Sequence, residues 1–218
     1  MWIILPVKHL QDSKIRLKNV LSDEQRHRFS YLLLTDTLQT LSSSMHVQGI
    51  TIISSDQSLV RIAEQCHAEF ILTGRDNGYS KDAMDAITAL SKNGVDTITI
   101  IPTDLPQLSH RDLELLVKVH KEGITLCAAE KEGGTNALVF TPPLAIPLLF
   151  GPNSYKKHQQ AATDKGITVK TVQAPGLQRD IDRSDDLLWL CKQSTGGKAW
   201  QYIRTILKED SFSSQAHE

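Results

Sequence analysis

The sequence predicts an α/β protein built on a doubly wound, mostly parallel sheet. Short apolar segments rich in Ile, Val and Thr alternate with segments whose apolar residues recur every three to four positions. This alternation is typical of strands that are connected by helices. The 218 residues contain no internal repeat and no low-complexity linker. We therefore expect one domain over residues 1–208 and a frayed tail over residues 209–218.

The strand predictions rest on short β-rich runs that are bounded by polar or turn-forming residues. In chain order these runs are residues 2–7, 50–53, 69–72, 97–101, 124–129, 137–140 and 167–172, then a short extended segment at 177–181. The helix predictions rest on apolar spacing between capping signals, such as the capping box at Ser22 and the Asn93-Gly94 helix end. In chain order the predicted helices are residues 22–41, 56–63, 80–91, 109–121, 154–165, 184–190 and 198–207.

Composition excludes several classes of protein. The net charge of −1 provides no general attraction to nucleic acid, and no segment approaches the roughly 18 apolar residues of a membrane span. The first seven residues carry no basic leader and predict a strand instead of a signal peptide. Cys66, Cys127 and Cys191 form no CxxC pair, which argues against disulfides or a zinc site and fits a reducing cytoplasm. We expect small molecules as partners; the oligomeric state is left open.

The most informative stretch is the strand that ends in Pro102-Thr103-Asp104-Leu105-Pro106. The two prolines stiffen the backbone around Asp104 at the carboxyl end of a buried strand, where open α/β sheets bind ligands. Asp104 is therefore a candidate metal ligand. On its own it suits equally well a turn or the N-cap of the helix that begins near Ser109.

A second acidic element is Arg179-Asp180-Ile181-Asp182. On an extended segment its two carboxylates face the same way while Ile181 faces the other. Alone, this run also suits a solvated acidic cluster that leads into a helix. Three converging carboxylates, however, repel one another unless a hard cation neutralises them. Asp104, Asp180 and Asp182 together therefore predict a Mg²⁺ site.

The loop after the first strand is basic. Lys8, Lys14 and Arg16 would lie at the carboxyl end of that strand, within reach of the phosphates of a nucleotide. A solvated surface loop is the alternative. The Gly196-Gly197-Lys198 triplet lacks the upstream Gly and the following Ser or Thr of a Walker loop, so a P-loop NTPase is not expected.

Two loops combine glycine with hydroxyl side chains: Gly133-Gly134-Thr135-Asn136 and Gly151-Pro152-Asn153-Ser154. Glycine lets backbone N–H groups approach an anion, and Ser154 would begin a helix, where a phosphate is favoured. The pair predicts a second anion pocket, and His158 follows Ser154 by one helical turn on the same face. Simple turns and a buried structural histidine are the alternatives.

These motifs, in this order, resemble the guanylyltransferases that make the side-chain precursor of the deazaflavin coenzyme (F-420), over about the first 190 residues. That family activates phospholactate, phosphoenolpyruvate or phosphoglycerate with GTP. The matching segments are Leu5-Pro6-Val7-Lys8, Lys14-Ile15-Arg16-Leu17, Pro102-Thr103-Asp104-Leu105-Pro106, Gly133-Gly134-Thr135-Asn136-Ala137-Leu138, Phe150-Gly151-Pro152-Asn153-Ser154-Tyr155 with His158, and Asp180-Ile181-Asp182.

The resemblance implies a Rossmann-like, mixed but mostly parallel sheet of the nucleotide-diphospho-sugar transferase (GT-A-like) type. It implies that Asp104, Asp180 and Asp182 bind Mg²⁺. It also implies that Thr135, Gly151 and Ser154 hold the acid in a pocket lined by His158, and that Lys8, Lys14 and Arg16 face the GTP phosphates.

Two departures from the family pattern accompany these matches. The chain has Gly78-Tyr79-Ser80-Lys81 where the family has Gly-Leu-Asn, and the region after residue 190 has no counterpart. One rival function is a sugar-phosphate or molybdopterin nucleotidyltransferase, which would need a Gly-rich first loop. Another is a phosphatase that uses Asp180 and Asp182, and the last is a non-catalytic GTP-binding regulator. Which three-carbon acid is used is left open.

Overall fold

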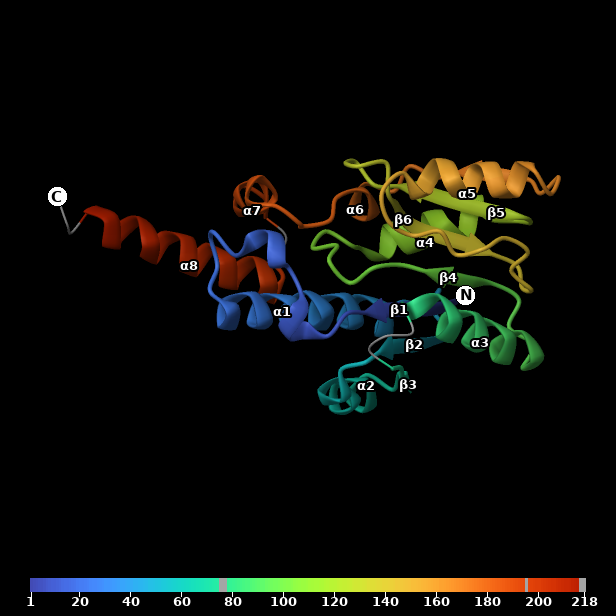
Figure 1. Cartoon of the computed structure of the whole chain (residues 1–218), viewed down its shortest axis with the longest axis horizontal. Coiled ribbons are helices and arrows are strands. Elements are labelled where there is room, and N and C mark those ends of the chain that lie inside the picture. The colour runs from blue at the N-terminus through green and yellow to red at the C-terminus, as the bar shows by residue number, and fades with distance from the viewer. Residues whose placement is uncertain (75–77, 195, 216–218) are drawn as a thin grey trace.

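A seven-stranded sheet forms the centre of the molecule. The computed structural model describes the backbone of residues 1–74, 78–194 and 196–215, and the side chains of residues 1–74, 81–194 and 196–207 (Figure 1). The strands are β1 (Trp2–Val7), β2 (Gly49–Ser54), β3 (Glu69–Leu72), β4 (Ile98–Ile100), β5 (Ile124–Ala128), β6 (Thr135–Phe140) and β7 (Val169–Thr171). They lie in the order β3-β2-β1-β4-β6-β5-β7. Only β6 runs antiparallel to its neighbours, so the predicted mixed, mostly parallel sheet is confirmed.

Helices cover both faces of the sheet. The α-helices are α1 (Asp23–Ser42), α2 (Val60–Gln65), α3 (Gly78–Lys92), α4 (His110–Val119), α5 (Ser154–Thr163), α6 (Pro175–Gln178), α7 (Ser184–Cys191) and α8 (Lys198–Gln215). Three single 3-10 turns are η1 (Leu10–Asp12), η2 (Ile15–Leu17) and η3 (Gln57–Leu59). None of the described helices is long and apolar enough to cross a membrane.

The alternation of side chains along the strands explains why the sheet is covered on both sides. In β1, Ile3 and Leu5 pack into one buried cluster together with α1, α2 and α4. Ile4 points the other way, into a second buried cluster with α3 and α5. A strand that is buried on both faces needs apolar residues throughout, which is the pattern of β1.

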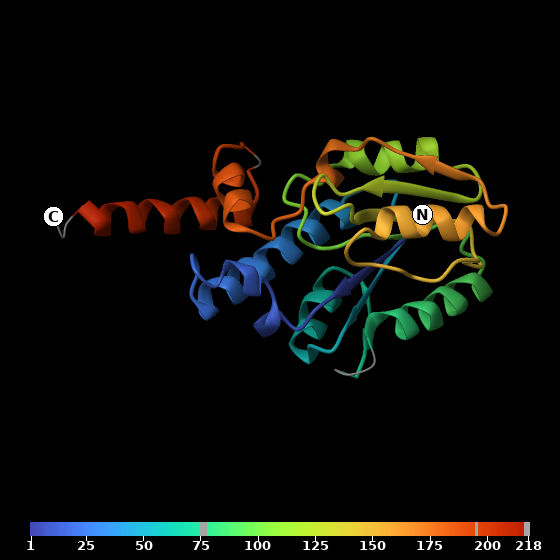
Figure 2. The ribbon, with the colours of Figure 1, turned by 45° about the horizontal axis from the view of Figure 1, so that its top comes forward.

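A third apolar cluster lies outside the sheet. Leu17 and Phe29 pack there with Leu187 and Leu190 of α7 and with Ile203 of α8. Figures 1 and 2 show α8 beside α1 and α7 next to the start of α8, with α8 extending away from the sheet. The cluster holds the carboxyl-terminal helices against α1 and leaves the ends of the central strands accessible.

The structure corrects three local predictions. Residues 177–181 were expected to be extended, but residues 177–178 belong to α6, whose first turn holds Pro175, a position that proline favours; Arg179, which follows the helix, is extended. Helix α7 has its N-cap at Arg183 instead of Ser184, because the Asp186 carboxylate accepts from the Arg183 N–H at 2.9 Å. Thr135 belongs to β6 instead of the preceding loop.

The predicted boundary of the domain at residue 208 stays a prediction. Helix α8 spans Lys198–Gln215 and so overlaps most of the predicted tail over residues 209–218. Residues 216–218 lie outside the described part of the chain.

Candidate functional site

The candidate site lies where β1 and β4 end and the antiparallel β6 begins. A cleft of about 340 Å³ opens there, lined by the loop after β1, by Pro102 and Asp104 after β4, and by Thr135 of β6. Asp180 and Asp182 close it from the segment between α6 and α7. The carboxyl end of parallel strands is the expected ligand-binding edge of such a sheet.

The three predicted metal-binding carboxylates meet in this cleft. Asp104, Asp180 and Asp182 each offer one oxygen atom, and these oxygens lie within 4.8 Å of one another. The Ile181 N–H donates to the Asp104 carbonyl at 3.2 Å, and the Ile181 side chain is completely buried. This anchor turns the flanking carboxylates of Asp180 and Asp182 toward Asp104, as the i, i+2 spacing predicted.

Lys14 lies between two of these carboxylates. Its Nζ atom is 2.5 Å from Asp104 Oδ2 and 3.1 Å from Asp182 Oδ1, and its side chain is only 8% exposed. Burial alone would lower the pKa of Lys14, but the attraction of the two carboxylates outweighs burial and raises it. Lys14 is therefore a charged part of the acidic site itself.

The remaining carboxylate has no such partner. Burial and the repulsion of Asp104 and Asp182 raise the pKa of Asp180. Its hydrogen bond from Asn136 Nδ2, at 3.4 Å, is long. Asp104 Oδ1 is buried without a hydrogen-bond partner among the described residues. An orphaned buried oxygen beside a destabilised carboxylate fits a hard cation such as Mg²⁺, which takes oxygen ligands.

The other two predicted basic residues lie at the rim of the site. Arg16 Nη1 is 3.6 Å from Asp182 Oδ2, and it also binds Glu132 at 3.0 Å. Lys8 is exposed and lines the cleft, and it makes no hydrogen bond or ion pair with the described residues. The structure thus places Lys8 and Lys14 in the wall of one cleft and Arg16 beside it, in contact with Asp182, although Lys14 contacts carboxylates.

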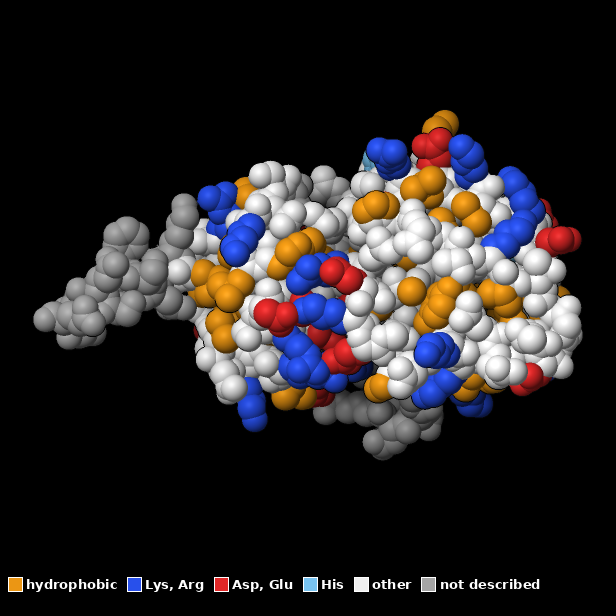
Figure 3. Space-filling view, turned by 90° about the horizontal axis from the view of Figure 1, so that it is seen from above, with side chains coloured by type: hydrophobic (Ala, Val, Ile, Leu, Met, Phe, Trp, Pro, Cys, Tyr) orange, Lys and Arg blue, Asp and Glu red, His pale blue; other side chains and the backbone are white. Residues whose placement is uncertain are grey.

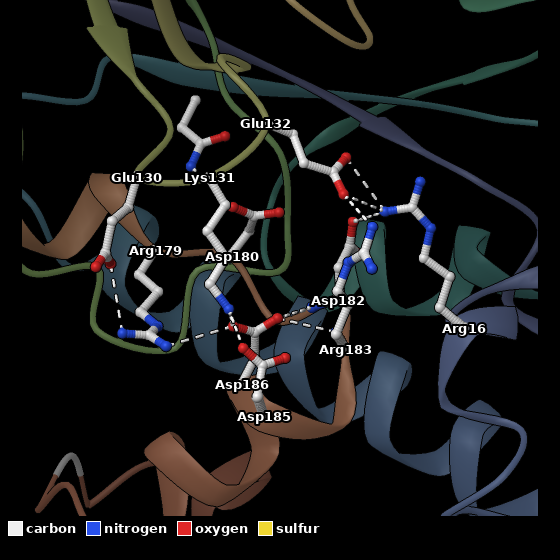
Figure 4. Close-up of polar contacts among 11 residues, drawn as sticks. Arg16, Glu130, Lys131, Glu132, Arg179, Asp180, Asp182, Arg183, Asp185 and Asp186 are labelled. Carbon is white, nitrogen blue, oxygen red and sulfur yellow. Dashed lines mark hydrogen bonds and ion pairs between the residues drawn. The ribbon is translucent and has the colours of Figure 1, made fainter.

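An ionic network, which the sequence analysis missed, fastens the β5–β6 loop to Arg183 and to the first turn of α7 (Figure 4). Glu132 binds both Arg16 and Arg183, the latter at 2.6 Å. Lys131 binds Asp185, and it binds Asp186 at 2.6 Å. Figure 3 shows charged side chains of both signs gathered in one area of this face. The alternating charges of residues 130–132 were the available signal.

The two glycine-containing loops form a second, smaller pocket beside the cleft. It has a volume of about 170 Å³, and Thr135, Gly151 and Ser154 line it together with Asp180 and Asp182. The loops are joined by two backbone hydrogen bonds, from the N–H groups of residues 153 and 155 to the carbonyls of residues 132 and 133. The predicted anion-pocket residues therefore do come together, next to the carboxylates.

His158 lies behind this pocket instead of in its wall. The side chain is completely buried and contacts Thr135, with Nδ1 3.0 Å from Thr135 Oγ1. Its Nε2 accepts from the Leu149 N–H at 2.9 Å, and the edge of the Phe150 ring packs against it with the ring centroids 5.2 Å apart. Burial lowers the pKa of His158 to about 4, so the ring is neutral near pH 7.

Backbone conformation also marks the site. Among the described non-glycine residues only four have a positive φ; two of them, Lys14 and Glu132, line these cavities, and a third, Asn153, lies between the lining residues Pro152 and Ser154. Such conformations are costly for residues with a Cβ atom and concentrate at functional sites. These conformations turn the three loops toward the candidate site.

A third, apolar cavity adjoins the cleft on its other side. It has a volume of about 360 Å³ and is lined by Pro6, Lys8, Ala83 of α3, Thr135, Leu148 and Phe150, and by residues 100–102. Sequence reasoning did not find it, because its wall comes from five separated segments. The first turn of α3 holds Gly78-Tyr79-Ser80-Lys81, the segment that departs from the family pattern. The side chains of Tyr79 and Ser80 lie outside the described residues.

Comparison with solved structures agrees with the expected fold. A protein from Desulfovibrio desulfuricans G20 described as a nucleotide-diphospho-sugar transferase aligns with a TM-score of 0.73 at 16% identity, over 95% of this chain and 96% of that one. A 4-diphosphocytidyl-2C-methyl-D-erythritol synthase aligns with a TM-score of 0.57 at 10% identity, over 87% and 95%. At such identities the likeness establishes the fold alone, and it confirms the nucleotide-diphospho-sugar transferase type.

Sequence comparison identifies the family. A phosphoenolpyruvate guanylyltransferase of Roseiflexus castenholzii is 34% identical over 212 residues, which cover 95% of both chains. A 3-phospho-D-glycerate guanylyltransferase of Colwellia psychrerythraea is 30% identical, over 85% of this chain and 88% of its own. A 2-phospho-L-lactate guanylyltransferase of Methanobrevibacter smithii is 28% identical, over 93% and 89%. The match to the family extends past residue 190, where no counterpart was expected. Residues 1–217 match the family described as "Guanylyl transferase CofC like", and the chain belongs to that family.

Proposed function

We propose that the protein transfers GMP from GTP to the phosphate of a small phosphorylated three-carbon acid and releases pyrophosphate, as a step of deazaflavin coenzyme biosynthesis in the cytoplasm. The acid is phosphoenolpyruvate, 2-phospholactate or 3-phosphoglycerate, the three compounds for which its relatives are named. The observation that carries the proposal is the three-carboxylate cluster at the junction of a small hydroxyl-lined pocket and a larger cleft.

The small pocket suits the acid. Its volume of about 170 Å³ lies below the roughly 300–1,000 Å³ of pockets that hold drug-sized ligands. The Thr135 hydroxyl and the open backbone at Gly151 offer hydrogen-bond donors to an anion, and Ser154 lines the same wall and contacts Thr135. It shares Thr135, Asp180 and Asp182 with the cleft, so a phosphate bound there would lie beside the carboxylates.

The cleft and the apolar cavity together suit the nucleotide. Lys8 lines both cavities, and Lys14 and Arg16 lie on the same loop, so these cations would contact the phosphate chain. The apolar cavity beside Lys8 has the mostly hydrophobic lining that suits a base. The α-phosphate would then lie between the apolar cavity and the acid pocket.

The reaction needs little covalent help from the protein. An oxygen of the acid's phosphate attacks the α-phosphorus of GTP in line, and the bond from that phosphorus to the α–β bridging oxygen breaks. Pyrophosphate leaves with the electron pair. The attacking phosphate is largely ionised near pH 7, so no general base is required, and catalysis rests on positioning and charge neutralisation.

Charge neutralisation falls to Lys14 and to a metal ion. Asp104, Asp180 and Asp182 would hold Mg²⁺, which when bound supplies positive charge between the two anionic substrates. Lys14 orients Asp104 and Asp182 through its two contacts. Thr135 and Ser154 orient the acid.

The direct test is pyrophosphate release from GTP and MgCl₂ with each of the three acids supplied separately. We expect release with at least one acid and no release without an acid. GTP binding without release for every acid would contradict the transfer reaction and favour a GTP-binding regulator. Release with a sugar phosphate in place of the acids would point to a different nucleotidyltransferase.

A further inference from the structure

We propose that His158 is a positioning residue that fixes the Thr135 hydroxyl as a hydrogen-bond donor to an anionic oxygen of the acid. This inference rests on the proposed function, because it assigns a role within the same acid pocket. His158 itself does not touch the acid, since it is completely buried and Thr135 stands between it and the pocket.

The first step is the tautomer of the ring. The Leu149 N–H donates to Nε2 of His158 at 2.9 Å, so Nε2 carries a lone pair and no hydrogen. The ring is neutral because burial lowers its pKa to about 4. A neutral imidazole has one N–H group, and it must therefore be at Nδ1. Nδ1 lies 3.0 Å from Thr135 Oγ1 and donates to it.

The second step is the orientation of the Thr135 hydroxyl. Ser154 Oγ also donates to Thr135 Oγ1, at 3.1 Å. A hydroxyl oxygen has two acceptor lone pairs and one hydrogen, and these two donors occupy both lone pairs. The hydroxyl hydrogen of Thr135 then remains available to donate to another group. In the described part of the chain the Thr135 side chain makes no further hydrogen bond.

The third step is the location of that hydrogen. Thr135 lines the acid pocket, the cleft with the three carboxylates and the apolar cavity, so this residue stands where the three cavities meet. An oriented donor at this point attracts an anionic oxygen. A freely rotating hydroxyl would spend part of its time presenting a lone pair, which repels the same oxygen. His158 and Ser154 remove that alternative.

Helix α5 provides both donors to Thr135. Ser154 is its first residue and His158 follows four residues later, so the two side chains lie on the same helical face. The ring of His158 is held on the opposite side by the Leu149 N–H and by the edge of Phe150. These contacts fix the orientation of the His158 ring and its tautomer, and through Nδ1 they fix the orientation of the Thr135 hydroxyl.

The test is a double-mutant cycle between Thr135→Val and His158→Leu, measured as KM for the acid and for GTP. Each single change should raise the acid KM about tenfold, the effect of one lost hydrogen bond to a charged group, with the GTP KM little changed. In the Thr135→Val background, His158→Leu should have almost no further effect. An equal rise in both backgrounds would overturn the proposal, because His158 would then act independently of the hydroxyl.

Two further variants separate positioning from folding. In His158→Gln the amide oxygen can accept from Leu149 N–H while the amide nitrogen donates to Thr135, and we expect most of the acid affinity to return. His120 is a matched control: it is also buried and bonded to two threonine hydroxyls, Thr125 and Thr141, but lines none of the cavities. His120→Leu should leave the acid KM unchanged even where it lowers stability. A loss of acid affinity in His158→Gln as large as in His158→Leu would contradict the proposal.

A measurement without turnover distinguishes this inference from the proposed function. Nitrogen-15 NMR of histidine-labelled protein near neutral pH should find His158 protonated at Nδ1 and not at Nε2. Protonation at Nε2 would overturn the inference whether or not the protein is active. Failure of the wild-type protein to use any acid, with the Nδ1 tautomer found, would instead refute the proposed acid and retain the oriented hydroxyl.

Discussion

At the scale of single residues, the site is organised by an imbalance of charge. Three carboxylates converge, and Lys14 reaches only two of them, Asp104 and Asp182. Asp180 remains with a raised pKa, and Asp104 Oδ1 remains without a partner. The single ammonium group of Lys14 therefore does not neutralise the cluster. A divalent cation would supply the missing positive charge where the substrate phosphates bind.

The first prediction concerns Asp104. Asp104→Asn keeps the shape of the side chain but removes the charge that Lys14 and Mg²⁺ would share, so turnover should fall at least about a thousandfold. The thermal midpoint should change little, because Lys14 keeps Asp182 as a partner. Pyrophosphate release measures the first effect and calorimetry the second.

The control for this variant is Asp96→Asn, at an exposed position before β4 and outside every cavity of the site. It should have wild-type turnover. Near-normal turnover in Asp104→Asn would contradict the assignment of Asp104 as a Mg²⁺ ligand.

A second residue-scale prediction concerns Glu132, an exposed carboxylate that binds both Arg16 and Arg183. Glu132→Gln should release Arg16 and reduce negative charge at the rim, so the KM for GTP should fall severalfold at low salt and approach the wild-type value at high salt. Stability should change little, because exposed ion pairs contribute little. A GTP KM that rises at low salt would mean that Glu132 orients Arg16 for binding.

At the scale of elements, the carboxyl-terminal helices depend on one side chain of α1. Asp36 accepts from the N–H groups of Lys198 and Ala199, at 3.0 and 2.9 Å, and so caps the start of α8 across 162 positions of sequence. A Cβ atom at Gly197 would lie 2.6 Å from Asp36 Oδ2, which explains why glycine precedes the helix. The capped helix end then brings Ala199 and Ile203 into the third apolar cluster.

This cap supports an element-scale prediction. Asp36→Ala should destabilise the protein by about 1–2 kcal/mol, the usual cost of losing an N-cap. Amide hydrogen exchange should become faster than in wild type, mainly in residues 198–207. The KM values for GTP and for the acid should stay unchanged, because Asp36 lines none of the site cavities. Asp36→Asn, which keeps one acceptor oxygen, should lose less stability than Asp36→Ala. Equal exchange in Asp36→Ala and wild type would show that packing alone holds α8.

At the scale of the whole molecule, buried histidines couple stability to pH. His158 has a folded-state pKa of about 4, well below the ordinary value of 6.5. The unfolded chain therefore binds a proton that the folded chain does not, and stability is lost as the pH falls from about 6.5 toward 4. The contribution of His158 amounts to about 3 kcal/mol. Burial also lowers the pKa of His120, so it acts in the same direction.

The corresponding prediction compares wild type with His158→Gln by chemical denaturation at several pH values between about 7 and 4.5. The variant should lose less stability over this range, because glutamine does not titrate. Asp56 and Asp186 have lowered pKa values and contribute mainly below pH 4, outside this comparison. Identical slopes for the two proteins would contradict the burial of a neutral His158.

Much of this architecture was predictable because it depends on local patterns. The buried strands follow from β-rich runs, α1 from its capping box at Ser22, and the position of Asp104 from the strand that precedes it. The i, i+2 spacing of Asp180 and Asp182 likewise indicated carboxylates that face one way. Each signal lies within a few neighbouring residues, where period and capping operate.

What could not be predicted depends on contacts between distant segments. Glu132 and Arg16 are separated by 116 positions, and Lys14 and Asp182 by 168, so no periodicity connects them. Lys14 was assigned to phosphates, whereas the structure pairs it with carboxylates. The four-residue helix α6 is too short to have a helical period, and the direction of β6 depends on its pairing with β4 and β5.

The central claim, attack of the acid's phosphate on the α-phosphorus of GTP, is tested most directly by an oxygen label. The active acid would be supplied with ¹⁸O in its phosphate group, and both products would be weighed by mass spectrometry. The account predicts that all the label stays in a guanosine-diphospho-linked acid and that pyrophosphate is unlabelled. Label in pyrophosphate, or free GMP in place of the linked product, would contradict it.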